Sequence, residues 1–540
     1  ELHSADFLRV KHIIRHTQTG NIRLRGYRFR RAKYFQQLFD WMLNEVAMLV
    51  EVQGRDSKDI KIQGMVDIPL EDVKGLRELI LTEKPYPQLS FREIRFPVYS
   101  QYKHERKKHI FENGRLVCRW VYTRIINDKG KSYEGSVRKI FARESDKIGR
   151  KTGEGNTPQR PITVVSGSGS TESSPSMEFL NHDPTILEQA SRLDRKDPDR
   201  QYTFGDFFCG VGGTSQGAQD AGLKVRFGLD FDKDACEAYK ENFPRTLVFH
   251  KDAHLFLSQD PNHIGQNHLY KDDPIRIKDL MGTDIVHLSP PCQYFSPAHT
   301  RDGKKDQANY EAIYTVAPIL SLLKPRIATL EETPGLLTHR QHSNIFWALL
   351  CQLNKAGYNV RYKRANLVEY GLAQPRRRLF IMAARQDVPL PDFPKPTHGE
   401  KGSGLLQFHY VWDAFDPLRT ANPRQLARDK FHQPQNMKLF TIPKTSYDPT
   451  KNFLRGLITT SGGDGYHSSG LRRHTVRENA LLQSFPLDYI FVGRPSQAQR
   501  QVGNAVPPKV AKTFYQHCIK FLRAFDHGLV GIEDDPSKVD

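Results

Sequence analysis

Residues 202–217 read YTFGDFFCGVGGTSQG, in which an apolar run leads into a glycine-rich turn and then into a segment suited to a helix. Glycines at Gly210, Gly212 and Gly213 permit a tight turn and let a ligand approach the backbone closely. A strand, a glycine-rich turn and a helix in this order open many parallel sheets that bind nucleosides. The alternative is a turn with a purely structural role.

Strand-like runs recur between helix-like segments along the following chain, at 224–230 (KVRFGLD), 284–290 (DIVHLSP), 326–332 (RIATLEE) and 377–385 (RRLFIMAAR). This alternation predicts an α/β fold of the Rossmann-like type, with a mostly parallel sheet and helices on both faces. Ligands of such sheets bind outside the carboxyl ends of the strands, and the candidate motifs of this chain fall there.

The composition restricts the class of protein. The 540 residues are 38% hydrophobic and 26% charged, with a formal net charge of +19. This excess of positive charge favours nucleic acid as partner, with an anionic membrane second and a merely solvated basic surface as the alternative. No apolar run approaches the ~18–20 residues of a membrane span, so no membrane partner is expected. None of the six cysteines forms a CxxC pair, so we expect reduced thiols and no metal site.

A stretch rich in Gly, Ser, Thr and Pro divides the chain. Residues 150–178 have too little apolar content to form a core and are predicted to be a flexible linker. Upstream, strand-like runs predict a β-rich module over 1–149, with helical pieces near 35–48 and 70–82. Downstream, we expect the α/β core over 179–398, a small domain over 399–473 and a closing segment with a helix over 474–540.

Two acidic residues follow the glycine-rich turn and predict a nucleoside site. Asp230 ends the next strand and can bind both ribose hydroxyls, and Asp252 can accept a hydrogen bond from an adenine amino group. The dinucleotide pattern G-x-G-x-x-G wants glycine where this chain has Ser215, and no P-loop pattern occurs. S-adenosylmethionine, which carries ribose and adenine but no phosphate, fits this variant turn.

The stretch DIVHLSPPCQYFS (284–296) places Cys292 behind Pro290 and Pro291 at the end of a predicted strand. The two prolines fix φ and hold the thiol stiffly. A catalytic cysteine reacts as the thiolate, whereas the common alternative for a lone cysteine is a small buried apolar residue. Glu331 ends a neighbouring strand, and Arg376 and Arg378 share one face of an extended segment.

A thiol, a carboxylic acid and an arginine pair can act together on a pyrimidine. The thiolate adds to C6, the acid engages N3 as charge develops, C5 takes a methyl group from a sulfonium, and a base then removes the C5 proton so that the thiol leaves.

The motifs of this chain resemble those of the cytosine-C5 DNA methyltransferase family, over about 200–400 and 470–515 and in the family's order. They are DFFCGVGG, GLDFDKDACEAYKENFP, SPPCQYFSPA, EETPGLL, YGLAQPRRRLFIMAAR, TVRENALLQSFP and QVGNAVPP. The resemblance implies double-stranded DNA as substrate and a target cytosine flipped out of the duplex. It also implies that residues 399–473 form a target-recognition domain that contacts bases and backbone.

The resemblance assigns a role to each matching position. Cys292 corresponds to the nucleophile and Glu331 to the acid that engages N3, while Arg376 and Arg378 would hold the flipped base and its phosphate. The S-adenosylmethionine pocket would be lined by Phe208, Gly210, Gly212, Asp230, Asp252, Pro290, Asn504 and Val506.

Two positions depart from the family pattern. The usual Glu-Asn-Val triplet is Glu331-Glu332-Thr333 here, and the usual Pro-Gln before the arginines is Ala373-Gln374. The triplet and the N-terminal segment resemble the fungal branch tied to repeat-induced point mutation and premeiotic silencing (the RID-like methyltransferases). That branch implies a nuclear protein with de novo activity on duplicated DNA. The N-terminal module resembles a divergent BAH-type domain, which would bind chromatin or pack on the catalytic domain.

Three functions therefore stand open: an active DNA cytosine-C5 methyltransferase, a DNA-binding silencing factor with a degenerate active site, and a tRNA methyltransferase of the same fold. The motifs do not separate DNA from tRNA, although the net charge favours DNA. A homodimer is also left open.

Overall fold

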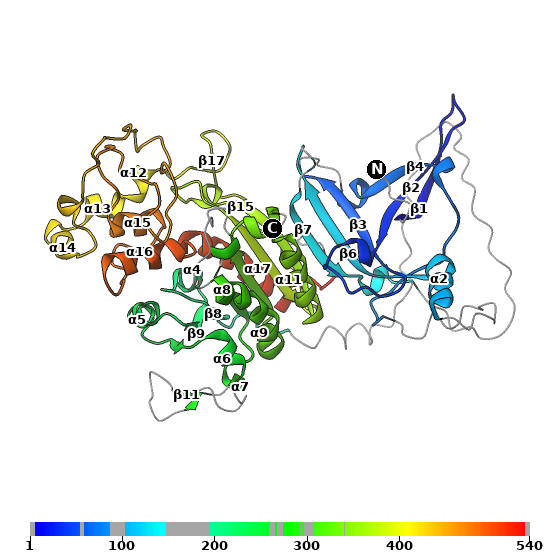
Figure 1. Cartoon of the computed structure of the whole chain (residues 1–540), viewed down its shortest axis with the longest axis horizontal. Coiled ribbons are helices and arrows are strands. Elements are labelled where there is room, and N and C mark those ends of the chain that lie inside the picture. The colour runs from blue at the N-terminus through cyan, green and yellow to red at the C-terminus, as the bar shows by residue number, and fades with distance from the viewer. Residues whose placement is uncertain are drawn as a thin grey trace.

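The computed structural model describes residues 6–54, 59–86, 103–128, 130, 132–146, 195–258, 265–266, 274–275, 277–291, 293–295, 306–339 and 341–534. The linker predicted at 150–178 and Cys292, the predicted nucleophile, lie outside these residues. Strands from both parts of the chain join in one sheet of 14 strands, whose order is β1-β2-β3-β6-β7-β15-β16-β14-β13-β8-β9-β10, with β4 and β5 beside β2 and β6 (Figure 1).

The C-terminal seven strands of this sheet form the predicted α/β core. They are β8 (Thr203–Phe207), β9 (Lys224–Asp230), β10 (Leu247–His250), β13 (Ile285–Leu288), β14 (Ile327–Glu332), β15 (Tyr358–Asn366) and β16 (Arg377–Arg385). Neighbours from β14 through β13, β8 and β9 to β10 pair in parallel, while β16 is antiparallel to both β14 and β15. The mostly parallel sheet is thus confirmed for this core, whereas the sheet as a whole is mixed.

Helices cover both faces of the core sheet, as expected. One face carries α6 (Ala253–Leu257), α7 (Ile277–Leu280), α9 (Val316–Leu323) and α11 (Ser343–Lys355). The other face carries α4 (Gly213–Asp220) and α17 (Pro508–Asp526), which pack together. The remaining helices of this part are α5 (Lys233–Asn242), α8 (Asp306–Ala312), α10 (Gly335–Thr338), α15 (Val476–Leu482) and α16 (Pro495–Asn504).

Helix α17 shows why the chain closes on itself at this point. Val510, Phe514, Cys518 and Phe525 recur at helical spacing and are buried against the sheet. At the last turn of the helix, the Asp526 carboxylate lies 2.5 Å from the guanidinium of Arg326, at the start of β14. The closing segment is therefore part of the α/β core rather than an appendage.

The N-terminal part is β-rich, as predicted. Its strands are β1 (Asp6–Arg15), β2 (Ile22–Arg31), β3 (Glu45–Gln53), β4 (Met65–Pro69), β5 (Leu79–Leu81), β6 (Leu116–Ile126) and β7 (Ser132–Lys139), and its helices are α1 (Ile60–Gln63) and α2 (Lys103–Asn113). The helical piece expected near 35–48 was wrong, because β3 occupies part of that range. The piece expected near 70–82 is limited to a short 3₁₀ helix (Leu70–Asp72), and β5 follows it. In β3, the run EVAMLVEV pairs between β2 and β6, and this pairing outweighs the helix-forming Glu, Ala, Met and Leu.

The N-terminal module shares its sheet and its core with the catalytic part. Strand β7 pairs antiparallel with β15, from Val137 opposite Val360 to Glu134 opposite Lys363 (Figure 1). Tyr122 packs edge-on against Trp347 at 5.7 Å, and its hydroxyl lies 3.1 Å from that of Tyr362. One apolar cluster joins side chains from both parts.

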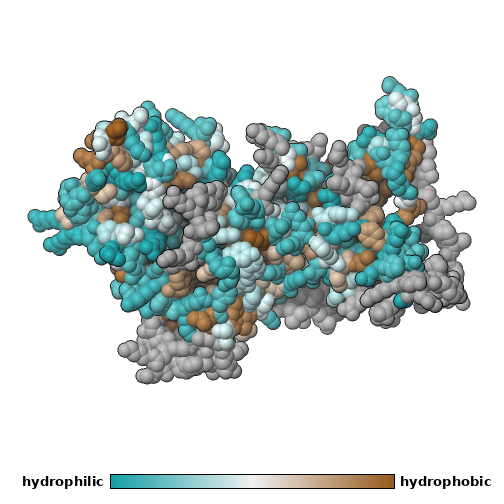
Figure 2. All heavy atoms as spheres, in the orientation of Figure 1, coloured by the Kyte–Doolittle hydropathy of each residue, from teal (hydrophilic) through white to brown (hydrophobic). Residues whose placement is uncertain are grey.

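The region over 399–473 contains short elements: β17 (His398–Gly399), β18 (Leu406–Gln407), α12 (Val411–Ala414), α13 (Asp416–Thr420) and α14 (Pro423–Arg428). Strands β11 (Gly265–Gln266) and β12 (Pro274–Ile275) form a separate hairpin. Hydrophilic residues dominate the face seen in Figure 2. In the described part of the chain, no helix has the length and apolar character that crossing a membrane requires.

Candidate active site

The turn after β8 has the strained backbone that the glycines predicted. Gly210 and Gly212 have φ angles of +54° and +91°, and the non-glycine Phe208, two residues before Gly210, has a φ angle of +57°. A Cβ at Gly210 would meet nothing within 4 Å, so this face is open to a ligand. A Cβ at Gly212 would come within 2.4 Å of the Phe243 ring, which makes Gly212 a packing residue beneath the turn.

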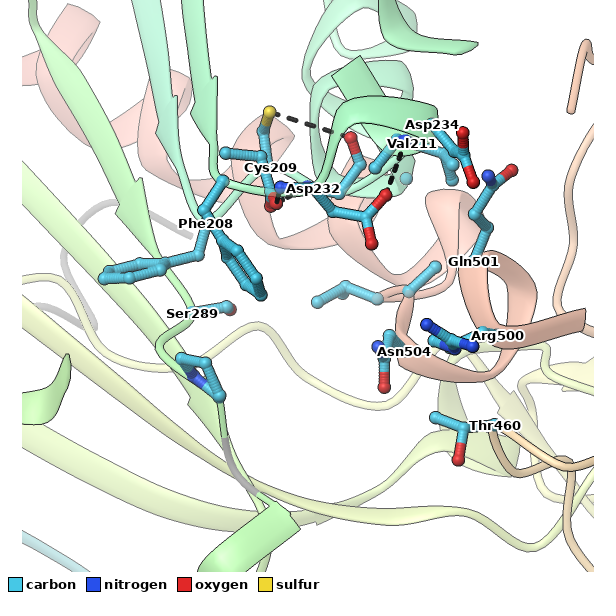
Figure 3. Close-up of a pocket in the computed structure, with 18 of the residues that line it drawn as sticks. Phe208, Cys209, Val211, Asp232, Asp234, Ser289, Thr460, Arg500, Gln501 and Asn504 are labelled. Atoms are coloured by element: carbon cyan, nitrogen blue, oxygen red, sulfur yellow. Dashed lines mark hydrogen bonds between the residues drawn. The ribbon is translucent and has the colours of Figure 1, made fainter. Parts of the chain in front are cut away.

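A cavity of about 670 Å³ opens beside this turn (Figure 3). Seven of the predicted site residues line it: Phe208, Gly210, Asp230, Pro290, Glu331, Asn504 and Val506. They come from β8, β9, β13 and β14 and from the chain around the end of α16. The carboxyl ends of neighbouring strands thus meet at one cavity, as the topology requires.

Asp230 is held rigidly at the mouth of this cavity. Its carboxylate accepts hydrogen bonds from the backbone N–H groups of Gly210 and Asp232, each at 2.8 Å. Burial raises the pKa of Asp230, and these two backbone donors oppose the rise. The next residue, Phe231, also lines the cavity and is 47% exposed. A fixed carboxylate, an exposed aromatic ring and an open glycine suit the ribose and adenine of S-adenosylmethionine.

The sequence analysis did not predict Phe231 as a site residue, although an aromatic residue directly after the predicted ribose-binding acid was a usable signal. Asp252 lies elsewhere: it caps α6, and its side chain accepts a hydrogen bond from the backbone of His254 at 2.8 Å. Neither Asp252 nor Gly212 is among the residues that line the cavity.

Glu331 and Arg378 meet at the cavity. Glu331 is 5% exposed, and one of its carboxylate oxygens lies 2.6 Å from Nε of Arg378. The contact is an ion pair rather than a well-aligned hydrogen bond. It joins β14 to β16, where Glu331 and Phe380 are partners in the register. Pro290 and Pro291, which directly precede Cys292 in the sequence, line the same cavity.

Arg376 does not join this pair. Its guanidinium donates to the carbonyl oxygens of Ile458 at 3.0 Å and Gly503 at 3.2 Å. It therefore ties the recognition region to α16. A Cβ on Gly503 would come within 2.4 Å of the Thr459 backbone, so the two segments touch at this point. The resemblance to the family had predicted that both arginines hold the flipped cytosine and its phosphate.

The recognition region itself reaches the cavity. Thr460 and Ser461 line it, together with Arg500 and Gln501 of α16 (Figure 3). Sequence reasoning missed these four residues. The signal was present in the glycine-rich stretch around Thr460, but its position over the cavity depends on Arg376 and Gly503, which lie far away in the sequence.

Glu332 faces away from Glu331 because side chains alternate along a strand. It is completely buried, and neither of its carboxylate oxygens has a hydrogen-bond partner among the described residues. Burial, with the neighbouring charge of Glu331, raises the pKa of Glu332 well above its usual value.

Comparison with known proteins decides the family. The model of the C-5 cytosine-specific DNA methylases matches residues 202–417 and 412–520, more than half of the chain. The chain belongs to this family. It is a cytosine-C5 DNA methyltransferase, and its relatives are spread over bacteria and plants.

Two relatives of this methyltransferase illustrate that spread. The type II methyltransferase M1.HphI of Haemophilus parahaemolyticus is 28% identical over 345 residues, which are 59% of this chain and 87% of that protein. DNA (cytosine-5)-methyltransferase 3 of Arabidopsis thaliana is 24% identical over 421 residues, which are 57% of this chain and 30% of that protein. A solved structure, the S. pombe Dnmt2 methyltransferase, aligns with 59% of this chain and 98% of its own at a TM-score of 0.41 and 15% identity.

Proposed function

We propose that this protein transfers a methyl group from S-adenosylmethionine to C5 of a flipped-out cytosine in double-stranded DNA, through a covalent adduct between Cys292 and C6. One observation carries the proposal. Glu331, which forms an ion pair with Arg378, lines the same cavity as Asp230 and Phe231, beside the Pro290–Pro291 turn. One cavity thus supplies a nucleoside site and an oriented carboxyl group next to the position of a thiol.

Each group has a definite part in the reaction. The Cys292 thiolate adds to C6, and the electron pair of the C5–C6 double bond moves toward C5 while Glu331 stabilises the ring at N3. Arg378 holds Glu331 in place for this contact. S-adenosylmethionine supplies the methyl group that C5 takes. A base then removes the C5 proton, and the electrons of that C–H bond restore the double bond as the thiolate leaves.

The biological setting is a finer part of the proposal. The Glu331-Glu332-Thr333 triplet and the N-terminal module support a place in the fungal RID-like branch, with de novo activity on repeated DNA in the nucleus. The net charge of +19 supports a polyanionic substrate. The module packs on the catalytic core along β7 and β15. Chromatin binding by the module would use the surface that this contact leaves exposed.

A second function has an observation of its own. Glu332 is buried without a hydrogen-bond partner in the described part of the molecule, directly beside the predicted acid. An altered position of Glu331 would leave DNA binding intact and methyl transfer weak. The protein would then be a silencing factor that binds DNA without modifying it.

Covalent trapping separates these functions. The protein is incubated with S-adenosylmethionine and duplex DNA that carries 5-fluorocytosine, in which fluorine blocks the final elimination. We expect an adduct that survives denaturation, that disappears in Cys292→Ala, and that persists in Cys351→Ala, which removes a thiol elsewhere.

The other outcomes are equally definite. DNA binding without an adduct would favour the silencing factor and contradict the methyltransferase proposal. An adduct that forms on a 5-fluorocytosine-containing tRNA but not on the duplex would replace DNA by tRNA as the substrate.

A further inference from the structure

Four polar side chains form a hydrogen-bonded chain from α17 to the cavity. The Tyr515 hydroxyl on α17 lies 3.2 Å from the hydroxyl of Thr329 on β14. That hydroxyl lies 2.9 Å from Nδ1 of His287 on β13, whose Nε2 lies 2.5 Å from the Ser289 hydroxyl. Tyr515, Thr329 and His287 are buried, while Ser289 is half-buried and lines the cavity.

The chain has a preferred direction. The Tyr515 hydroxyl has Thr329 as its partner, and a buried phenol that donates to nothing costs free energy. Tyr515 therefore donates to Thr329, whose own proton goes to Nδ1 of His287. The neutral ring then carries its proton on Nε2 and donates it to Ser289. In the opposite direction, Ser289 would donate to His287, His287 to Thr329, and Thr329 to Tyr515. The Tyr515 hydroxyl would then lack an acceptor within the described structure.

The neutral state of His287 is consistent with this direction. Burial lowers its pKa to about 3, so the ring stays uncharged over the working pH range of most enzymes. A neutral imidazole has one donor and one acceptor nitrogen, and each is used once here. His287 thus does not act by titrating. Its neutral ring accepts a hydrogen bond at one nitrogen and donates one at the other.

Because Ser289 already accepts from His287, its own proton is left to point elsewhere. Figure 3 shows Ser289 beside Phe208 on one side of the cavity, across from Arg500, Asn504 and Thr460. Strand register places Ser289 next to Glu331, since Leu288 and Leu330 are partners in the parallel pairing of β13 and β14. The hydroxyl therefore faces the region where the reactants meet.

We propose that Ser289 donates a hydrogen bond to an oxygen of the bound reactants, and that His287, Thr329 and Tyr515 are positioning residues that fix it as a donor. The acceptor is either the carboxylate of the amino-acid part of S-adenosylmethionine or the carbonyl oxygen of the flipped pyrimidine. This inference rests on the proposed function, because it takes the reactants from that proposal. Of the four residues, only Ser289 is among those that line the cavity.

The first test measures binding by calorimetry without DNA. The probes are S-adenosylhomocysteine, which keeps the carboxylate, and 5′-methylthioadenosine, which lacks the amino-acid part. If the acceptor is the carboxylate, Ser289→Ala weakens the first probe about tenfold, as expected for a hydrogen bond to a charged group, and leaves the second unchanged. If it is the pyrimidine, both affinities stay unchanged and the KM for DNA rises instead. Unchanged binding of both probes and an unchanged KM would overturn the inference.

The second test uses Tyr515→Phe, which removes a hydroxyl remote from the cavity. The chain can then reverse, and Ser289 donates into the cavity only part of the time. If Ser289→Ala weakens the binding of S-adenosylhomocysteine, Tyr515→Phe should also weaken it, by about twofold to fivefold. If Ser289→Ala instead raises the KM for DNA, Tyr515→Phe should raise that KM by the same factor. In the Ser289→Ala background, Tyr515→Phe should have no further effect. Additive effects would indicate a merely structural role for Tyr515 and overturn the relay.

A matched control is available in the same apolar cluster. The Tyr370 hydroxyl donates to the carbonyl of Pro394 at 2.9 Å and has no link to the cavity, so Tyr370→Phe should leave all affinities unchanged. Failure of the wild-type protein to bind S-adenosylhomocysteine would refute the proposed cofactor. Wild-type binding that Ser289→Ala leaves unchanged, together with an unchanged KM, would refute only the role of Ser289.

Discussion

Glu331 and Glu332 are neighbours in the chain, yet they lie on opposite faces of β14 and differ in their surroundings. Glu331 has Arg378 as a charged partner at the cavity, whereas Glu332 is enclosed in the apolar interior. A carboxylate enclosed in this way is costly, and its surroundings shift the equilibrium toward the protonated form. Burial and the neighbouring charge of Glu331 raise the pKa of Glu332, so the additional acid favours its uncharged form more than an exposed carboxyl group would.

We expect Glu332→Gln to stabilise the protein at pH 8. A carboxyl group with a raised pKa must take up a proton on folding, which costs nothing below its unfolded value near 4.5 and progressively more as the pH rises above it. The gain in unfolding free energy should be on the order of 1–3 kcal/mol at pH 8 and should vanish toward pH 4.5. Urea unfolding at several pH values measures it, and a pH-independent difference would contradict the assignment.

Residue-scale prediction from the sequence worked where a motif carries its own geometry. The turn at Gly210 and the carboxylate of Asp230 are held by contacts between segments that are close in the sequence. Arg376 was different, since its partners belong to Ile458 and Gly503, far along the chain. A spacing of two residues indicates a shared face, but it does not reveal what each side chain meets there.

Among the elements, the predicted recognition region over 399–473 reaches the cavity through Thr460 and Ser461. Helices α12, α13 and α14 lie at the far end of the molecule from the N-terminal module (Figure 1). The loop that holds Thr460 and Ser461 returns to the cavity and packs on α16. The sequence indicated a glycine-rich loop around Thr460, but the short, irregular elements before it did not reveal that this loop returns to the cavity.

Exchange of residues 408–455 for the equivalent segment of a family member with another target should change the sequence preference of DNA binding. Affinity for S-adenosylhomocysteine should stay within about twofold, because the exchange leaves the loop at Thr460 in place. Exchange of the whole region 399–473 should weaken that affinity as well. Competition binding with a library of duplexes measures the preference, and an unchanged preference would exclude this region as the reader of the sequence.

At the scale of the whole molecule, the two parts form one folding unit. The predicted linker lies outside the described residues, and strand pairing joins the parts on either side of it, because β7 and β15 each leave an edge that the other satisfies. Composition alone cannot reveal such a pairing, since both strands read as ordinary strands in their own halves.

Gly135→Val tests this unity. A Cβ at Gly135 would come within 2.6 Å of the Tyr362 hydroxyl and of the Thr123 carbonyl oxygen, so β7 would have to move away from β15. We expect a loss on the order of 1–3 kcal/mol in unfolding free energy, with both parts still unfolding in one transition. Gly75→Ala is the control, since a Cβ there meets nothing within 4 Å. A catalytic part that unfolds separately, with its stability intact, would contradict the single unit.

The join between β7 and β15 also sets an order of events during synthesis in the cell. Strand β7 leaves the ribosome first, and its partner follows roughly 220 residues later, a delay on the order of 10–40 s at about 5–20 residues per second. For that interval the nascent N-terminal half holds an open sheet edge and unburied aromatic rings. Newborn chains are therefore most exposed to misassembly, and most in need of chaperones, in the interval before the catalytic half arrives.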